Sequence, residues 1–205
     1  MTTPVPSPSS AMTPLILASA SPRRRELIAR LGIVPEAVVP ADIDEAERKG
    51  ELPLVYARRI AAAKAARVSP LHPGKAVLGA DTVVAAGRRM LHKTDDRGEA
   101  RAFLRLLSGR RHRCHSAITL IDAAGKARHR VSTSIVAFKP LSDREIETYL
   151  SLGEWEGKAG AYAIQGYAES WVRLLSGSFS GVMGLPLFET RALLDAAGLL
   201  PAANA

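Results

Sequence analysis

A run of serines and arginines near the N-terminus has the composition of an anion-binding site. Residues 15–28 combine a short apolar strand, a turn of small hydroxyl residues and a helix that opens on three consecutive arginines. Ser21 is a favourable N-cap residue, and Pro22 suits the first helical position. Arginines oppose the helix dipole there, and a bound phosphate chain would explain them. At 100° per residue, Arg24 falls on the packed face and Arg23 at its edge, which favours a ligand-binding Arg24 over one that extends to solvent.

Two charged residues interrupt segments whose pattern predicts burial. Lys64 lies in the middle of the apolar face of an expected helix at 53–68, and Asp81 interrupts an otherwise apolar strand at 76–86. A buried charge is costly unless it is paired or bound to a metal. For Lys64 the alternatives are a structural ion pair and a lysine directed at phosphate in a cleft. For Asp81 they are metal ligation and general-base catalysis.

Further residues carry weaker signals. Asp44 and Glu45, in the acidic loop 41–46, could join Asp81 around Mg²⁺, which prefers carboxylate and phosphate oxygens, although such a loop is more often only solvated. Lys93 follows a short expected hairpin and could reach a phosphate. Gln165 stands at the expected end of a strand, before a glycine, where its amide could both donate to and accept from a nucleobase edge.

Strand and helix patterns alternate along the first half of the chain and hairpins follow, which predicts an α/β fold with a mixed sheet. Expected strands cover residues 15–19, 36–40, 76–86, 112–122, 127–138, 161–165 and 171–176. Expected helices cover residues 22–31, 53–68, 97–107, 142–151 and 186–197. Ser142 and Glu145 have the spacing of a capping box. Glycine and proline gather at 153–160 and 177–186, where active-site loops are expected.

The N-terminal segment differs from the rest of the chain. Residues 1–14 are rich in Ser, Thr and Pro, carry no charged side chain and are expected to be disordered. They lack the basic region and long apolar core of a signal peptide, and Met12 is an alternative start to Met1. Residues 15–200 are expected to form a single domain.

The overall composition limits the class of partner and the compartment. With 205 residues, 47% of them hydrophobic, the chain can bury a sizeable core, and it has no apolar run long enough to span a membrane. A net charge of +8 favours an anionic partner. Because the basic residues are scattered and only 5% of residues are aromatic, a phosphorylated small molecule is favoured over nucleic acid. The single cysteine, Cys114, fits a reducing cytoplasm and is more readily explained as a small buried residue than as a nucleophile.

In order along the chain, these residues form a set of motifs that resembles the Maf family of nucleoside triphosphate pyrophosphatases. The resemblance runs from about residue 15 to residue 194, which is nearly all of the chain after the N-terminal segment. The matching segments are residues 19–24, 44–45, 79–82, 162–166 and 184–186, together with Lys64 and Lys93.

The resemblance implies a fold and a reaction. The fold is an elongated, twisted mixed sheet flanked by helices, with a nucleotide-binding cleft between two lobes, as in Maf and ITPase-like proteins. The reaction is hydrolysis of a nucleoside triphosphate between its α- and β-phosphates with Mg²⁺ or Mn²⁺, and a homodimer is also implied. The family's proposed proton acceptor falls on Asp81, and the sequence leaves open whether Asp81 is a base, a metal ligand or both. The family's phosphate- and metal-handling positions fall on Ser19, Arg24, Glu45, Lys64 and Lys93.

Three positions that separate the branches of the family fall on Arg23, Thr82 and Gln165. These residue types are similar to those of the dTTP/UTP-hydrolysing branch rather than the branch that acts on 7-methyl-GTP. A glutamine amide can satisfy both the N3–H donor and a carbonyl acceptor of thymine or uracil, whereas a carboxylate can only accept. The chain departs from the family pattern at Thr94 and at residues 115–116, which could alter loop geometry near the metal.

Two alternatives stay open at the level of sequence. The first is a non-catalytic regulator of septum formation that binds a nucleotide or nucleic acid, as an older description of the family suggests. The second is a house-cleaning pyrophosphatase of the nucleotide pool whose substrate is a modified pyrimidine triphosphate. A pocket distinguishes one methyl group by only about 1–3 kcal/mol, so the sequence does not rank that substrate against dTTP.

Overall fold

The computed structural model describes residues 14–200 of the chain. The expected disordered segment, apart from Pro14, and the choice between Met1 and Met12 lie outside these residues. The strands are β1 Leu15–Ala18, β2 Ala37–Val38, β3 Ala76–Ala86, β4 Arg89–Leu91, β5 Arg111–Ile121, β6 Ala127–Phe138 and β7 Val172–Ser176. The α-helices are α1 Pro22–Ala29, α2 Pro53–Val68, α3 Arg97–Leu107, α4 Asp143–Leu152, α5 Phe179–Met183 and α6 Leu187–Asp195. Short 3-10 helices cover Ser69–Leu71, Ala159–Ala161 and Tyr167–Trp171.

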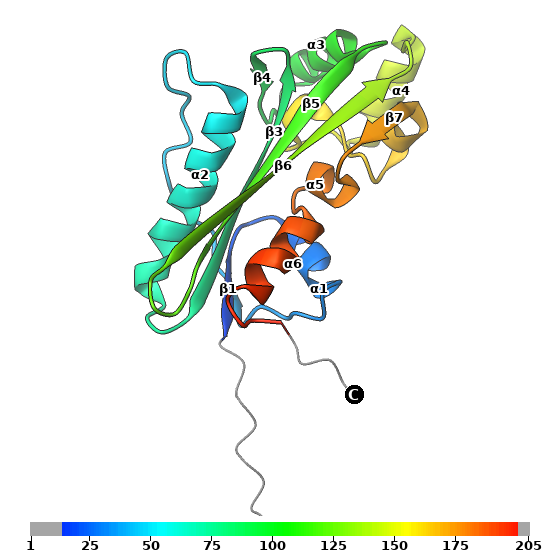
Figure 1. Cartoon of the computed structure of the whole chain (residues 1–205). Coiled ribbons are helices and arrows are strands. Elements are labelled where there is room, and N and C mark those ends of the chain that lie inside the picture. The colour runs from blue at the N-terminus through cyan, green and yellow to red at the C-terminus, as the bar shows by residue number, and fades with distance from the viewer. Residues whose placement is uncertain (1–13, 201–205) are drawn as a thin grey trace, which may run out of the picture.

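A long, twisted, mixed sheet organises the described residues, with strand order β2-β1-β3-β5-β6-β7 and with β4 paired to β3 (Figure 1). The short strand β1 is parallel to β2 and β3, whereas β3, β5, β6 and β7 form an antiparallel series. Helices lie against both faces, so the expectation of an α/β fold with a mixed sheet flanked by helices is confirmed. Within residues 14–200, no helix has both the length and the apolar character needed to cross a membrane.

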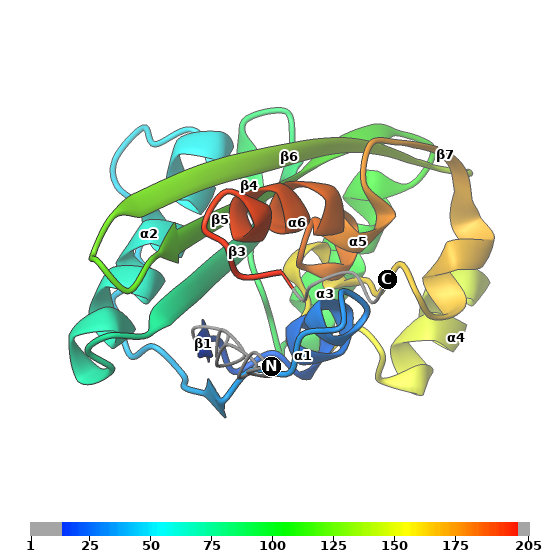
Figure 2. The same ribbon diagram turned by 60° about the horizontal axis from the view of Figure 1, so that its bottom comes forward.

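The two faces of the sheet are covered by different helices, as Figures 1 and 2 show from two directions: α2 lies on one face, and α5 and α6 lie on the other. The alternation of side chains along β3 assigns its residues to these faces. Val83 packs in the α2 cluster, and Val84 packs in the main core. Gly79 faces α2 so closely that an added Cβ would lie 2.5 Å from the Ala61 carbonyl oxygen. Asp81 therefore points toward α2.

The sheet has a gap along one edge of β3. Strand β1 pairs with residues 76–79 of β3, and β4 pairs with residues 84–86 of the same strand. The opposite edge of β3 is occupied by β5. In the part of the chain that the structure describes, residues 80–83 therefore have no strand partner on the β1 side. The chain leaves β1 and β4 at the two ends of this gap, and the loops that follow them can reach into it.

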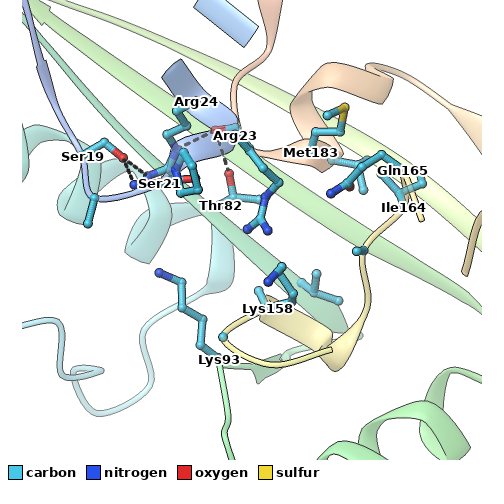
Figure 3. Close-up of a pocket in the computed structure, with 18 of the residues that line it drawn as sticks. Ser19, Ser21, Arg23, Arg24, Thr82, Lys93, Lys158, Ile164, Gln165 and Met183 are labelled. Carbon is cyan, nitrogen blue, oxygen red and sulfur yellow. Dashed lines mark hydrogen bonds between the residues drawn. The ribbon is translucent and has the colours of Figure 1, made fainter. Parts of the chain in front are cut away.

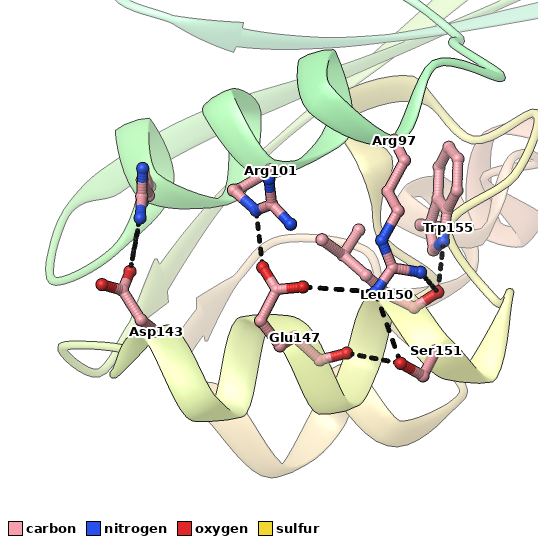
Figure 4. Close-up of polar contacts among 8 residues, drawn as sticks. Arg97, Arg101, Asp143, Glu147, Leu150, Ser151 and Trp155 are labelled. Atoms are coloured by element: carbon pink, nitrogen blue, oxygen red, sulfur yellow. Dashed lines mark hydrogen bonds and ion pairs between the residues drawn. The ribbon is translucent and has the colours of Figure 1, made fainter.

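Helices α3 and α4 support the loop that follows them through ion pairs between their exposed faces (Figure 4). The Glu147 carboxylate accepts from Arg101 Nε at 2.5 Å and from Arg97 Nη2 at 3.2 Å, and these cations lower the pKa of Glu147 to about 2. Exposed pairs of this kind add little stability. Arg97 also donates to the Leu150 carbonyl, as does the buried Trp155 Nε1 at 2.9 Å. These contacts fix the start of the loop at 153–158.

The expected elements are confirmed with shifts of a residue or two at most ends, apart from the second strand, which is reduced to Ala37–Val38, and the C-terminal loops. The capping box is present, because Ser142 Oγ accepts from Glu145 N and the Glu145 carboxylate accepts from Ser142 N. Ser21 is the N-cap residue of α1, but its side chain makes no capping bond. Instead, its backbone N–H donates to Ser19 Oγ at 3.1 Å.

The expected strand at 161–165 is wrong. Ala161 ends a 3-10 helix in which Gly160 has φ 70° and Ala161 has φ 54°, a region that a strand does not visit. Tyr162 is extended but is not part of a strand, and residues 164–166 form a turn. Residues 161–164 are apolar because they are buried against the core rather than because they alternate in a sheet. The short helix α5 was also not expected, and it starts where Ser178 Oγ accepts from Gly181 N.

A buried histidine makes the stability of this core sensitive to pH. His112 is 2% exposed, Nε2 lies 2.9 Å from Tyr162 Oη, and within residues 14–200 its buried Nδ1 has no hydrogen-bond partner. Burial lowers the pKa of His112 to about 4. The unfolded chain therefore binds a proton below about pH 6.5 that the folded chain does not bind until about pH 4.

We expect the free energy of unfolding to fall by about 3 kcal/mol through His112 as the pH drops across this window, and by no more below it. Carboxylates titrate in the same range, so the measurement is a comparison between two proteins. Urea unfolding near pH 7 and near pH 4.5 should show a shallower loss of stability for His112→Phe than for the wild type. Equal losses in the two proteins would contradict the assignment.

Candidate active site

A cavity of about 350 Å³ opens at the gap in the sheet (Figure 3). Its walls come from the β1–α1 loop, α2, β3, the segment after β4, the loop at 156–165 and α5. Eight of the predicted site residues line it: Ser19, Arg23, Arg24, Glu45, Lys64, Thr82, Lys93 and Gln165. The ninth, Asp81, lines an adjoining cavity of about 220 Å³ that shares Glu45, Thr82 and Lys93 with the first. The structure thus brings all nine residues to one place.

The turn after β1 is held by Arg24. The Arg24 side chain is buried, its Nε donates to the Gly184 carbonyl oxygen at 2.8 Å, and its Nη1 donates to Ser19 Oγ at 3.2 Å. Burial lowers the pKa of Arg24, and the negative charge of Asp81 opposes that effect. The packed position expected for Arg24 is confirmed. Arg24 joins the β1–α1 turn to the segment after α5, so it shapes the cavity whether or not it also contacts a ligand.

A cluster of Lys64 and two carboxylates contains the two most buried charged side chains of the site. Lys64 is 6% exposed and Asp81 is 5% exposed, and Lys64 Nζ lies 2.9 Å from Asp81 Oδ1. Glu45 Oε1 lies 3.0 Å from the same ammonium, from a side chain that is 43% exposed. The Glu45 backbone is held in turn by Tyr56, whose hydroxyl donates to its carbonyl oxygen at 2.7 Å. Helix α2 therefore supplies the cation, β3 supplies one carboxylate, and the loop before α2 supplies the other.

This arrangement allows a divalent cation but does not enclose one. Among residues 14–200, no three His, Cys, Asp or Glu side chains gather closely enough to hold a metal ion. Asp81 and Glu45 nevertheless direct one oxygen each at the same point, where Lys64 Nζ now lies. Mg²⁺ is commonly held by one or two carboxylates together with substrate phosphates and water. The donor set fits such a cation once a phosphorylated ligand completes it.

Lys93 follows β4 and faces the same cavity from the side opposite Ser19 and Arg24 (Figure 3). Its side chain is solvent-exposed, yet its pKa is lowered, first by the walls of the cavity and then by the charges of Arg24 and Lys64. An anion between these cations would relieve the repulsion. Thr94, one of the departures from the family pattern, is buried beside it and anchors the loop, since Thr94 Oγ1 accepts from Asp96 N at 3.0 Å.

Thr82 belongs to a hydrogen-bond chain whose direction can be deduced. Ser116 Oγ donates its one proton to the Gly181 carbonyl oxygen at 2.5 Å. The one hydroxyl proton of Thr82 is then used inside the protein, toward Ser116 Oγ at 3.0 Å or toward the Gly184 carbonyl oxygen at 3.4 Å. Thr82 consequently presents acceptor lone pairs to the cavity and is matched to a ligand group that donates. Ser116, another departure from the family pattern, thus orients the hydroxyl of a predicted specificity residue. The neighbouring His115 bonds Thr133 instead.

Gln165 and Arg23 lie toward the other end of the cavity (Figure 3). Gln165 stands in a turn rather than at a strand end, and it is exposed. Its position is fixed from inside, because the Tyr149 hydroxyl accepts from Ala163 N at 3.0 Å. Burial lowers the pKa of Arg23, which is half-buried at the edge of the packed face of α1, as expected.

Two further residues of this cavity, which the sequence did not single out, bear on its chemistry. Lys158 and Met183 both line it and are drawn among its residues in Figure 3. Lys158 lies within the loop at 153–160 that the glycine content marked as an active-site loop, which was the available signal for it. Met183 lies within the second such segment, 177–186, but it ends a helix, α5, that was not expected there. With Ile164 it gives one wall an apolar surface.

Comparison with known proteins agrees with these motifs. A family model described as "Maf-like protein" matches residues 14–197. The chain belongs to the Maf family. Relatives named dTTP/UTP pyrophosphatase include the Maf relative from Zymomonas mobilis, 60% identical over 90% of this chain and 91% of that protein. The relative from Novosphingobium aromaticivorans is 55% identical over 94% of this chain and 96% of that protein.

A more distant match is found among solved structures. The structure of a nucleoside-triphosphatase / dITP/XTP pyrophosphatase from Mycobacterium abscessus covers 91% of this chain and 95% of that one. The sequence identity is 18% and the TM-score is 0.43. The family assignment comes from the Maf model and the sequence relatives alone.

Proposed function

We propose that this Maf protein is a dTTP/UTP pyrophosphatase, which hydrolyses its substrate between the α- and β-phosphates. One observation carries the proposal. The buried Asp81–Lys64 pair and Glu45 border a cavity into which Arg23, Lys93 and Lys158 also bring positive charge. A triphosphate supplies the negative charge that this cavity lacks. The names of the relatives that share 55–60% of their residues with this chain support the same activity.

The residues at the two ends of the cavity suit different parts of a bound nucleotide. The Gln165 end of the cavity is suited to the base, because an amide both donates and accepts, as the N3–H and a carbonyl of thymine or uracil require. The end near Asp81, Glu45 and Lys93 is suited to the phosphates. Thr82 lies between these ends and offers an acceptor to a donor on the nucleotide. This placement sets the scissile bond beside Asp81.

The proposed reaction transfers the α-phosphoryl group to water. A water oxygen bonds to the α-phosphorus, the bond from the α-phosphorus to the α–β bridging oxygen breaks, and that oxygen leaves with the pyrophosphate. Asp81 accepts the proton of the attacking water through the carboxylate oxygen that Lys64 does not hold. Lys64 holds this carboxylate in place. Lys93 balances the charge that develops on the phosphates.

A divalent cation is part of the proposal, as the family resemblance implies. Glu45 and Asp81 would hold it together with phosphate oxygens, and the cation would neutralise charge on the triphosphate. Binding would require Lys64 Nζ to give up part of its contact with the two carboxylates, since all three groups now meet. Mg²⁺ and Mn²⁺ both suit oxygen ligands of this kind.

The activity is tested by pyrophosphate release from a panel of nucleotides with Mg²⁺ or Mn²⁺. The panel contains dTTP, UTP, CTP, GTP, 7-methyl-GTP and modified pyrimidine triphosphates. We expect turnover to be confined to nucleotides of thymine, uracil and their modified forms. No release from any of them by folded protein would overturn the proposal and favour a binding role.

We further propose that the protein is a cytoplasmic homodimer. The family resemblance supports the homodimer, and the single cysteine, which is buried, supports a reducing cytoplasm.

The Gln165→Glu variant should lose activity on dTTP and UTP by about 10- to 100-fold in kcat/KM. A carboxylate cannot donate to a carbonyl of the base, and its charge is unfavourable beside a triphosphate. Steady-state kinetics with both substrates provide the measurement. The matched control is Glu169→Gln, a charge change at an exposed position a few residues away, which should leave kcat/KM unchanged. Equal activity of Gln165→Glu and wild type would refute base recognition by this residue.

A further inference from the structure

Lys158 faces the middle of the cavity, between its base-binding and phosphate-binding ends. Figure 3 shows its side chain directed into the open space, with the Arg23 guanidinium extending toward it and Lys93 to one side. The proposed function uses Gln165 at one end of this cavity and Asp81 at the other. It uses Lys158, which lies between them, only as part of the positive charge of the cavity and assigns it no particular phosphate.

The backbone of Lys158 is held on both sides. The Lys158 N–H donates to the Trp155 carbonyl oxygen at 3.1 Å, and the Lys158 carbonyl oxygen accepts from Ala161 N at 3.0 Å. Gly157 N donates to the Thr94 carbonyl oxygen at 3.3 Å, which joins this loop to the segment that carries Lys93. Trp155 is itself buried and bonded to α4. The side chain thus extends from a fixed point, as a substrate-binding group requires.

The ammonium of Lys158 has N–H donors that remain available for a ligand. Nζ donates to the Glu156 carbonyl oxygen at 2.7 Å, and an ammonium has three N–H donors. The ion pairs found among residues 14–200 do not include Lys158 or Lys93. The pKa of Lys158 is lowered mainly by burial, and the positive charge of Arg23 lowers it further. The group is therefore a partly desolvated cation that faces other cations, and a bound anion would stabilise it.

We propose that Lys158 binds the α-phosphate of the nucleotide, the phosphate that stays with the nucleoside after hydrolysis. This inference rests on the proposed function. Along a nucleoside triphosphate the order is base, sugar, α-phosphate and then the two phosphates that leave. With the base at Gln165 and the scissile bond at Asp81, the sugar and the α-phosphate lie between the two ends of the cavity, and of these two groups only the α-phosphate is an anion that the Lys158 ammonium can pair with. Lys93, nearer to Asp81, faces the phosphates that leave.

The two products of the reaction test this assignment, because the monophosphate retains the α-phosphate and pyrophosphate does not. Titration calorimetry with dTMP and with pyrophosphate, each with Mg²⁺, would be carried out on the wild type and on Lys158→Gln. We expect Lys158→Gln to bind dTMP about 10- to 100-fold more weakly, the range of a charge-assisted hydrogen bond, with pyrophosphate affinity changed by less than about twofold. In turnover of dTTP, kcat/KM should fall by the same 10- to 100-fold.

Three variants control the experiment. Lys93→Gln should show the opposite pattern, with pyrophosphate weakened more than dTMP. Lys126→Gln removes an exposed lysine in the β5–β6 turn and should change neither affinity. Lys158→Arg keeps the charge and should recover part of the lost dTMP affinity. Thermal unfolding of each variant should match the wild type, because the Lys158 side chain makes one backbone contact and no ion pair within residues 14–200.

Each other outcome overturns the assignment. Weaker pyrophosphate binding with unchanged dTMP binding would move Lys158 to the leaving phosphates. Unchanged affinities for both products would leave Lys158 outside the substrate site. A wild-type protein that releases no pyrophosphate from dTTP would instead refute the proposed function, which separates the two failures.

Discussion

The Asp81→Asn variant should lose pyrophosphate release from dTTP by about 10³-fold in kcat while it keeps its fold, because general-base catalysis contributes about 10²–10⁴-fold. An asparagine has the same shape, and its amide oxygen can still accept from Lys64 Nζ, 2.9 Å from the present carboxylate oxygen. It cannot take a proton from water at neutral pH. Initial rates of pyrophosphate release over a range of dTTP concentrations provide kcat, and circular dichroism with thermal unfolding checks the fold.

The chain offers a matched control for this variant at Asp44. The Asp44 side chain is exposed, and its Oδ1 accepts from the Ala46 backbone N–H at 2.8 Å. It lines neither cavity. Asp44→Asn makes the same chemical change a short distance away and should leave kcat within about twofold of the wild type. Near-normal turnover by Asp81→Asn would remove Asp81 from the reaction as base and as metal ligand alike.

The Lys64→Met variant should lose both activity and stability. Methionine fits the apolar face of α2, but it leaves the buried Asp81 carboxylate without the ammonium that now lies 2.9 Å away. Removing one partner of a buried ion pair costs about 3–5 kcal/mol, and a chain of this size should lose roughly 6–20 °C in Tm. Glu45 is half-exposed and can turn to water, so the smaller losses in this range are expected. Differential scanning calorimetry and urea unfolding measure the loss.

A double variant separates the ion pair from the packing of Lys64. Lys64→Met combined with Asp81→Val replaces both charges with apolar groups, which is often neutral for a buried pair. It should be more stable than Lys64→Met alone and inactive. Lys75→Met removes a lysine from the exposed pair with Glu36 and should cost less than about 1 kcal/mol. A double variant less stable than Lys64→Met alone would show that the pair is not the origin of the loss.

Burial of single charged residues could be predicted from the sequence because it follows from local periodicity. A helix repeats every 3.6 residues, so Lys64 must share a face with its apolar neighbours, and Arg24 must share one with Leu27 and Ile28. An apolar strand pattern likewise placed Asp81 inside. The structure confirms that all three are buried. The spacing of the motifs predicted membership of the Maf family, which the match to the family model confirms.

The prediction from sequence was wrong where residues are buried without being in an α-helix or a strand. Residues 161–164 have the apolar composition of a strand, but Gly160 and Ala161 adopt positive φ and turn the chain inward. The direction of the Thr82 hydroxyl depends on Ser116 and on the Gly181 carbonyl oxygen, and the three residues come from three different elements, β3, β5 and α5. No window of sequence contains contacts of that separation.

Composition, periodicity and motif spacing were enough to predict which residue types carry the chemistry, which charges are buried and which family the chain resembles. The pairing of these charges, and the other residues that join them, follow from contacts between distant segments and are visible only in the folded protein. The site exists because β1 and β4 cover only the two ends of one edge of β3, which leaves residues 80–83 open between them. Pairing between distant strands decides where that edge is open, and a local pattern does not specify such pairing.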